Sequence, residues 1–299
     1  MSAPPLFRLV DERRVSVVRD AAAVRQVLDE DPVGSCMVAS RVAEHGVEPS
    51  AIGGELWTRR RASESLCYAG ANLIPLRGDL NDLNAFADKA MSTARRCSSL
   101  VGRAECVMPM WRRLEHAWGP ARDVREHQPL MALSTAPQSP IDPPVRPVRV
   151  DELDAYLVAA IDMFIGEVGI DPRIGDGGRG YRRRVAGLIA AGRAWARFER
   201  GQVVFKAEVG SQSPSVGQIQ GVWVHPDWRG HGLRHRGHRD AGVGGGAAAA
   251  ASRACDVNDF NTVARATYAR IGFTRGRHIR DRPSRLIVPA AAAALRFTP

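Results

Sequence analysis

The clearest pattern of hydrophobic positions along the chain predicts a strand over residues 216–224. Its apolar, β-branched positions are Val216, Ile219, Val222 and Val224. The turn signal His225-Pro226-Asp227 closes the strand, and the loop Arg229-Gly230-His231-Gly232 follows directly. Where a glycine loop opens a helix, its unpaired N–H groups and the helix dipole attract anions. We therefore expect a phosphate or pyrophosphate to bind this loop.

A second pattern predicts a helix beginning at Asn261, whose side chain is suited to cap it. Ala264, Tyr268 and Ile271 follow at spacings of four and three, so they share one face of this helix. Gly272 is placed to end it.

The strand, the Arg-Gly-x-Gly loop and this helix, in this order, resemble the coenzyme A-binding half of the GNAT acetyltransferase superfamily. The resemblance implies an α/β fold with a central, mostly antiparallel mixed sheet flanked by helices. It also implies that acetyl-coenzyme A is the cosubstrate and that Tyr268 protonates the departing thiolate. A buried tyrosine satisfied by a neighbour is the alternative for Tyr268. The expected cofactor-binding residues are Val222, Trp223, Val224, Arg229, Gly230, His231, Gly232, Leu233, Arg234 and Asn261.

Acyl transfer to an amine needs donors to the thioester carbonyl and a proton acceptor. Backbone N–H groups around 222–224 are placed to polarise the carbonyl. Glu208 is the only carboxylate between Gln202 and Val224, so it is the candidate base. The pattern nevertheless favours a solvated carboxylate at a strand end, with water relays or an already neutral amine making a side-chain base unnecessary. His225 and His231 lack metal-ligand spacing, and no metal is expected.

The remaining periodicity divides the chain into residues 1–133, a proline-rich linker at 134–147 and residues 148–299. The second part, which contains the motifs, has helical patterns over 151–164 and 181–192 and strand patterns over 194–198 and 202–209. The first part echoes this order, with helical patterns over 19–28, 82–96 and 107–118 and strand patterns over 54–58, 66–74, 98–101 and 128–133. Leu76-Arg77-Gly78-Asp79 replaces the glycine loop there, and its acidic residue would repel a phosphate. We interpret residues 1–133 as a degenerate, structural acetyltransferase-like domain.

The net charge of +10 suggests a nucleic-acid or membrane partner, but its distribution argues against both. Residues 234–255 and 275–299 together carry +8 of that charge, so no basic face extends over the fold. Apolar runs are too short to cross a membrane, and residues 1–19 lack a signal-peptide core, which predicts a cytoplasmic protein. The oligomeric state is left open. The five cysteines show no Cys-x-x-Cys pair and are expected to be reduced thiols: Cys36, Cys67, Cys97, Cys106 and Cys255.

Two segments depart from the family pattern. Arg234 stands where the loop normally has Gly or Ala, and neither 234–255 nor 275–299 shows a helical or strand pattern. With only two lysines, the chain has the signature of a GC-rich gene, and shifting each segment by one base permits the expected residues. We interpret both as out-of-frame translations; a genuine basic insertion and tail are the alternative. The chain as written is expected to be disordered in both segments and to bind acetyl-coenzyme A weakly or not at all.

The function predicted from these motifs is N-acetyltransfer from acetyl-coenzyme A to an amine of a small molecule or a protein. A non-catalytic acyl-coenzyme A-binding or regulatory module is the first alternative. A tandem acetyltransferase of the mycothiol synthase type is another. A nucleic-acid binder is the weakest.

Overall fold

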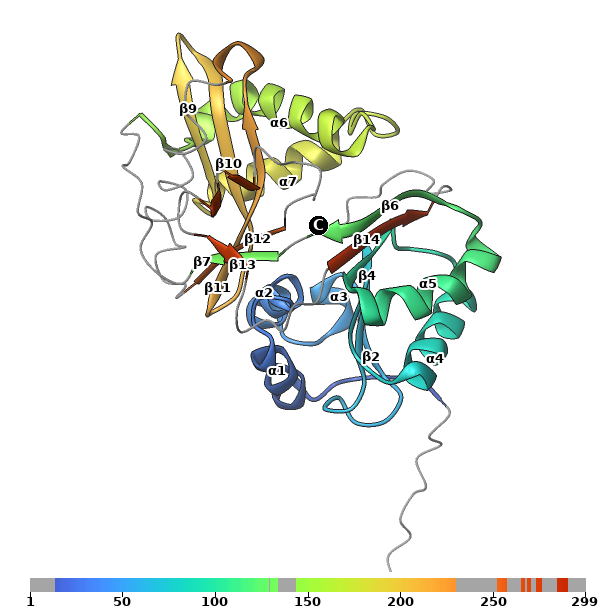
Figure 1. Cartoon of the computed structure of the whole chain (residues 1–299). Helices are drawn as coiled ribbons and strands as arrows, with labels where there is room; N and C mark the ends of the chain where they lie inside the picture. The colour runs from blue at the N-terminus through green and yellow to red at the C-terminus, as the bar shows by residue number, and fades with distance from the viewer. Residues whose placement is uncertain are drawn as a thin grey trace, which may run out of the picture.

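Two seven-stranded sheets with the same strand order form the body of the chain (Figure 1). The computed structural model describes residues 14–128, 130–133, 144–229, 252–256, 265–266, 268–269, 273–275 and 284–289. The first sheet has the order β1 (Ser16–Val17), β2 (Glu55–Thr58), β3 (Leu66–Ala69), β4 (Asn72–Arg77), β5 (Ser99–Arg103), β14 (Ser284–Pro289), β6 (Ala121–Gln128). The second has the order β8 (Arg146–Pro147), β9 (Ala194–Glu199), β10 (Gln202–Gln212), β11 (Val216–Val224), β12 (Ser252–Asp256), β7 (Leu130–Leu133), β13 (Thr274–Arg275).

In both sheets every neighbouring pair is antiparallel except the fourth with the fifth. These parallel pairs are β4 with β5 and β11 with β12. The predicted fold class, a mostly antiparallel mixed sheet flanked by helices, is therefore confirmed.

The sixth strand of each sheet comes from the part of the chain that forms most of the other sheet. The green strand β7 lies among the orange and red strands of the second sheet, and the dark red strand β14 lies beside the green β6 in the first (Figure 1). β14 pairs with β5 and β6, while β7 pairs with β12 and β13. The two sheets thus do not separate at the predicted boundary between residues 133 and 148. We call the elements of the first sheet and its helices the first half, and those of the second sheet the second half.

Helices cover these sheets because each helix has one apolar face. They are α1 (Ala21–Glu30), α2 (Cys36–His45), α3 (Pro49–Ile52), α4 (Leu80–Met91), α5 (Ala104–Trp118), α6 (Leu153–Val168) and α7 (Arg179–Ala190). In the first half, α4 and α5 pack in one core around Phe86 and Trp111, and α1 and α2 pack in another around Tyr68. In the second half, α6 and α7 cover one sheet face through Tyr156 and Tyr181.

Most elements expected from periodicity are present, and the first half also has the short elements β1 and α3, which were not expected. Three further differences have a physical reason. The predicted strand over 66–74 is a hairpin, since Gly70 and Ala71 turn the chain between β3 and β4. The helix α2 was not expected, because buried Ser40 interrupts its apolar face. The strand β6 was not expected because Arg122, Asp123 and Arg125 break its apolar alternation.

The expectation that 234–255 and 275–299 contain no regular structure is wrong in two places. β12 lies at 252–256 between β11 and β7, and β14 lies at 284–289 between β5 and β6. Backbone pairing to two neighbouring strands is available to almost any sequence, so tertiary context overrides an unfavourable composition there. The rest of both segments lies outside the described residues, and no observation bears on the reading frame.

The halves also touch through α2, which lies against the start of β11. The Cys36 thiol donates to the Val216 carbonyl at 3.3 Å, and the Gln212 N–H donates to the Ser40 hydroxyl at 3.1 Å. At the other end of the interface, Arg125 of β6 donates to the Glu167 carbonyl at 2.8 Å, in the last turn of α6. The hydrogen bonds of α2 are buried or partly buried and that of Arg125 is exposed, and together they fix how the two halves sit relative to each other.

Candidate active site

The predicted key strand β11 is interrupted by a bulge at Gly221. Glu208 of β10 faces Gln220, but Lys206, two residues earlier, faces Trp223, so β11 carries one extra residue between these positions. Gly221 has φ +58°, a left-handed conformation that is accessible to glycine at little cost. A bulge re-aims the peptide groups around it, here those of residues 220–223.

After Gln218, one edge of β11 has no strand beside it among the described residues. β12 pairs with β11 only at Val216, Gly217 and Gln218. From Ile219 to Val224, β10 is the one strand that pairs with β11 in the described part of the chain. Parallel neighbours that part after a few residues leave an open edge of backbone N–H and C=O groups, and the predicted donors at 222–224 lie on this stretch.

A buried ionic cluster lies beside the bulge on the face covered by α6 and α7. Lys206 and Glu208 are 0% and 1% exposed, and the Lys206 ammonium lies 2.7 Å from Glu208 Oε1. Tyr156 of α6 donates to the same oxygen at 3.2 Å. Arg184 of α7 lies 3.5 Å from Glu208 Oε2. A methyl group added to Gly221 would lie 3.3 Å from Oε2, so the carboxylate directly adjoins the bulge.

The ionisation of this cluster follows from its burial and its charges. Burial favours the neutral acid of Glu208, but the charges of Lys206 and Arg184 outweigh it and hold the pKa of the carboxyl below its usual value. Burial, followed by the adjacent Glu208 charge, raises the pKa of the Tyr156 phenol well above its usual value. Glu208 is therefore a carboxylate at neutral pH and Tyr156 a neutral donor. The alternative that Glu208 is a solvated strand-end carboxylate is wrong, because Glu208 is buried in the middle of β10.

Tyr268, the predicted proton donor to the departing thiolate, lies on the face of the second sheet opposite to α6 and α7. It is 6% exposed and packs in one core with Val222, Val224 and Ala207. Ala207 and Glu208 are adjacent in β10, so their side chains point to opposite faces. The Phe273 ring lies 5.5 Å from the Tyr268 ring between centroids. The structure thus places Tyr268 and Glu208 on opposite faces of the sheet that contains the bulged strand.

Of the other predicted cofactor-binding residues, the structure describes some and leaves the rest outside the described ranges. Trp223 is half-buried on the α6 and α7 face, and Arg229 donates from Nε to the Val224 carbonyl at 3.3 Å, just past the strand. His225 is half-buried, and its Nε2 lies 3.0 Å from Gln202 Nε2. Outside the described residues lie Gly230, His231, Gly232, Leu233, Arg234 and Asn261.

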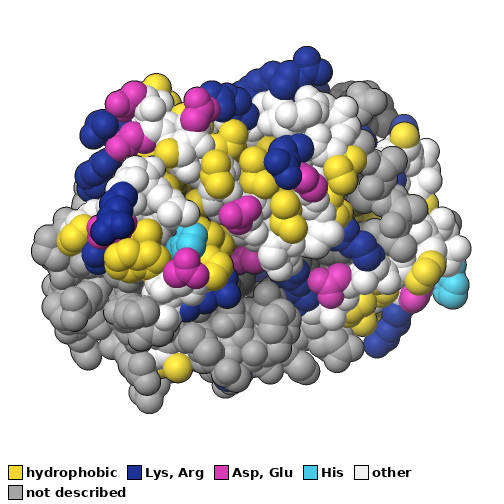
Figure 2. Space-filling view, turned by 90° about the horizontal axis from the view of Figure 1, so that it is seen from above, with side chains coloured by type: hydrophobic (Ala, Val, Ile, Leu, Met, Phe, Trp, Pro, Cys, Tyr) yellow, Lys and Arg dark blue, Asp and Glu magenta, His cyan; other side chains and the backbone are white. Residues whose placement is uncertain are grey.

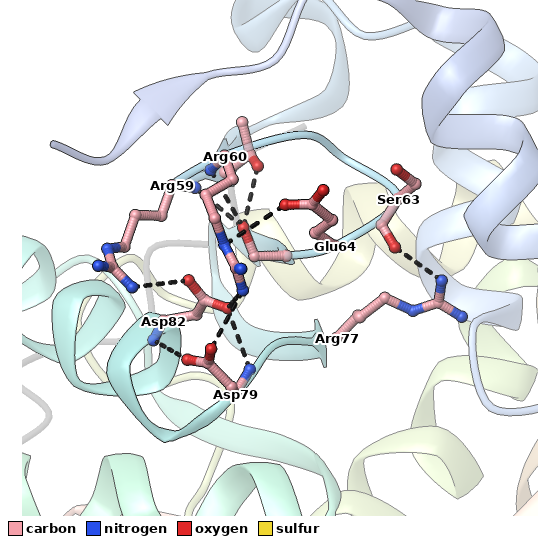
Figure 3. A network of polar contacts seen from close by, with 9 residues as sticks. Arg59, Arg60, Ser63, Glu64, Arg77, Asp79 and Asp82 are labelled. Atoms are coloured by element: carbon pink, nitrogen blue, oxygen red, sulfur yellow. Dashed lines mark hydrogen bonds and ion pairs between the residues drawn. The ribbon is translucent and has the colours of Figure 1, made fainter. Parts of the chain in front are cut away.

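In the first half, the position that corresponds to the glycine loop is filled by carboxylates (Figure 3). Asp79 caps α4 by accepting from the Asp82 N–H at 2.9 Å, and Asp82 accepts from the Asp79 N–H at 3.0 Å. Arg60 contacts both carboxylates, at 3.1 Å for Asp79 and 2.7 Å for Asp82. Arg59 lies 3.1 Å from Asp82, which is fully buried. The anion site that a helix N-terminus offers is thus occupied by the chain's own side chains.

The opening between β4 and β5, which corresponds to that between β11 and β12, is bridged. The strands pair at Asn72 and Leu73 and then part, but the Arg103 guanidinium donates across the gap to the Leu76 carbonyl at 2.6 Å. Pro75 in β4 has no N–H to offer a ligand. A small pocket remains beside this bridge, lined by the end of α1 and residues 74–77.

Charges on the face shown in Figure 2 are mixed. In the view of Figure 2, Lys and Arg side chains alternate with Asp and Glu, without a continuous basic patch in the coloured part of this face. Among the described residues, no group of three or more His, Cys, Asp or Glu side chains is arranged to hold a metal ion. None of the described helices has the length and apolar character to cross a membrane.

Four residues of this site, Lys206, Gly221, Tyr156 and Arg184, were not found from the sequence. The sequence contained a signal for Lys206 and for Gly221. Lys206 and the predicted residue Glu208 interrupt the apolar run Val203–Val209 at a spacing that puts both on one face. An isolated glycine within a strand pattern, as at Gly221, also indicates a bulge.

Comparison with known proteins places this geometry in context. A family model described as a domain of unknown function, DUF4081, matches residues 54–156. Among curated proteins no significant match is found.

Solved structures with a similar fold include acetyltransferases. One is an acetyltransferase of the GNAT family from Colwellia psychrerythraea, with 10% identity, a TM-score of 0.54, and coverage of 92% of this chain and 99% of that chain. A GCN5-related N-acetyltransferase from Kribbella flavida has 13% identity, a TM-score of 0.50, and coverage of 85% and 96%. A Drosophila protein has 12% identity, a TM-score of 0.60, and coverage of 92% and 98%. The chain therefore has the fold of GNAT acetyltransferases.

Proposed function

We propose that the second half is an N-acetyltransferase that moves an acetyl group from acetyl-coenzyme A to an amine. The observation that carries this proposal is β11, which combines a left-handed bulge at Gly221 with an edge that β12 leaves after Gln218. An extended thioester arm needs an unpaired strand edge, and its carbonyl needs N–H donors that already point at it. Both features lie within the same few residues.

In this reaction the amine nitrogen bonds to the acyl carbon, the carbon–sulfur bond breaks, the amine loses a proton and the thiolate gains one. Negative charge develops on the carbonyl oxygen, where the N–H groups of Val222 and Val224 stabilise it. The Trp223 N–H lies between them on the β10 side of the strand, the side to which the His225 N–H donates. We assign the amine proton to Glu208, directly or through water, because its Oε2 adjoins Gly221. Tyr268 is assigned the proton for the thiolate. The residues assigned to the pyrophosphate are Arg229, Gly230, His231, Gly232, Leu233, Arg234 and Asn261.

The first half is proposed to be structural, because Asp79 and Asp82 fill its anion site and Arg103 bridges its strand opening. A cytoplasmic location, a small-molecule or protein amine as acceptor, and the absence of nucleic-acid, membrane and metal partners belong to the same proposal.

Calorimetric titration with acetyl-coenzyme A tests the binding step, and thiol release with a panel of amines tests transfer. Both are done on the chain as written and on a version with residues 234–255 and 275–299 shifted in frame. Saturable binding with amine-dependent thiol release in either version supports the proposal. If neither version binds acetyl-coenzyme A, the proposal is wrong.

A non-catalytic acyl-coenzyme A-binding module is the second candidate, and the state of Glu208 favours it. A carboxylate whose pKa is held below its usual value by Lys206 and Arg184 is a weak base. Binding of acetyl-coenzyme A without thiol release for any amine would identify this function instead.

A further inference from the structure

Lys206 makes more contacts than an ion pair requires. Its ammonium is fully buried, lies 2.7 Å from Glu208 Oε1 and donates to the Gly221 carbonyl at 2.9 Å. It also lies 5.3 Å from the centre of the Tyr156 ring. Burying an ammonium is costly, and a buried ion pair stabilises a fold less than apolar residues of the same volume often would. Neutralising Glu208 therefore does not by itself explain why Lys206 also donates to the Gly221 carbonyl.

That bond fixes one peptide unit of the bulge. The Gly221 carbonyl and the Val222 N–H belong to the same planar trans peptide and point in opposite directions. An ammonium that holds the carbonyl on the α6 side consequently turns the Val222 N–H away from itself. Because Gly221 has a left-handed φ, the neighbouring strand register does not fix this orientation. A further contact is needed, and Lys206 supplies one.

We propose that Lys206 is a positioning residue that holds the Gly221–Val222 peptide so that the Val222 N–H faces the carbonyl oxygen of a bound acyl thioester. Lys206 does not touch the substrate in this arrangement. It acts through the peptide, and its ligand-binding consequence rests on the proposed acetyltransferase function. The arrangement selects a thioester over a free thiol, because only the thioester has a carbonyl to accept this bond.

The first test measures the peptide itself and needs no ligand. Hydrogen exchange is followed by mass spectrometry in the full chain and in Lys206→Met, which removes the ammonium while keeping an unbranched side chain of similar length. We expect exchange in a peptide covering 219–224 to be at least about tenfold faster, with the peptides of α4 and α5 unchanged. Lys89→Met replaces the chain's only other lysine, which lies in the first half, and is the matched control.

Lys206→Met leaves Glu208 without its closest cation, which can loosen the whole second half. Lys206→Met/Glu208→Gln removes both charges and isolates the lost bond to Gly221 from this effect. Faster exchange confined to 219–224 in the double variant supports the proposal. Unchanged exchange at 219–224 in either variant overturns it, and so does an equal increase throughout the second half in both.

The second test compares ligands by calorimetry. We expect Lys206→Met to reduce the preference for acetyl-coenzyme A over coenzyme A by about tenfold while the affinity for coenzyme A stays within about twofold. Equal losses for both ligands indicate a purely structural lysine and contradict the proposal. If the unchanged chain binds neither ligand, the proposed function fails, and the exchange experiment still decides the role of Lys206.

Discussion

The exchange of β14 and β7 between the halves predicts that removing the end of the chain unfolds the first half. The perturbation is a truncation after residue 283, which deletes β14. Because β14 lies between β5 and β6, its loss leaves β5 as an edge strand and detaches β6 from the sheet. A chain with independent halves would instead lose only the order of the second half.

The magnitude follows from the ladder. β14 is in register with β5 at four positions, from Ser284 facing Arg103 to Ile287 facing Leu100. It is in register with β6 at five positions, from Ser284 facing Gln128 to Pro289 facing Ala121. At about one hydrogen bond per position and about 1 kcal/mol net for each, the loss is on the order of 5–10 kcal/mol. This is comparable with the whole stability of an ordinary domain, about 5–15 kcal/mol.

Hydrogen exchange of α4, α5 and β5 measures this directly, and the fluorescence of Trp57, Trp111 and Trp118 reports the same half. We expect the truncated chain to lose protection in all three elements. Truncation after residue 289, which keeps β14, is the matched control and should retain it. Leu286→Pro provides a full-length test, because proline removes an N–H from a strand paired on both sides. Full protection of α5 and β5 in the chain truncated after residue 283 would refute the reasoning.

Three further predictions concern single residues. Gly221→Ala places a methyl group 3.2 Å from the Lys206 ammonium at φ +58°, so we expect a loss of about 1–2 kcal/mol in urea unfolding, and an unchanged midpoint would contradict the bulge. Glu208→Gln should lower turnover about 100-fold in the thiol-release assay while acetyl-coenzyme A still binds, and undiminished turnover would remove Glu208 from the mechanism. Hydrogen bonding from the Asp82 N–H, with a smaller contribution from Arg60, lowers the pKa of Asp79 below 3.8. The ionised carboxylate of Asp79 therefore stabilises the fold above about pH 3.8, and this stabilisation is lost as the pH falls through the lowered pKa. Asp79→Asn should be less stable than the unchanged chain at pH 5–7 and equal to it in strong acid. A stability difference that does not depend on pH would contradict this.

Much of the fold was predictable because its strongest patterns are local. The apolar spacing of Val24, Val27 and Leu28 predicts α1, and all three are buried. Phe86 and Ala90 do the same for α4, and the β-branched run at 216–224 gives β11 with the predicted bounds. Each of these elements buries one face, and burial of one face produces the periodic spacing of hydrophobic residues from which the element is predicted.

The strand exchange and the ionic cluster were not predictable in this way, because they depend on pairings between distant residues. β14 has a partner some 180 residues earlier in β5, and no local property of 284–289 specifies it. Lys206 and Glu208 were visible as polar residues in an apolar strand, but only the packing of α6 and α7 shows that Tyr156 and Arg184 contact Glu208. The glycine loop shows the reverse situation, since its sequence pattern is clear and its residues lie outside the described part of the chain.

The contacts between the halves give the proposed structural half a specific task. The open edge of β11 exists because β12 leaves it, and β12 is held on its other side by β7, a strand from the first part of the chain. The helix α6, which supplies Tyr156 to the cluster beside the bulge, has the carbonyls of Glu167 and Val168 in its last turn bound by Arg125 and Arg122 of β6. Cations at a helix C-terminus stabilise it, so α6 is held by β6 of the first half, while β12 is held by β7, a strand of the second sheet that comes from the first part of the chain. Residues 1–133, whose own anion site is filled by Asp79 and Asp82, can thus be retained for positioning β12 and α6, since neither task requires them to bind a ligand.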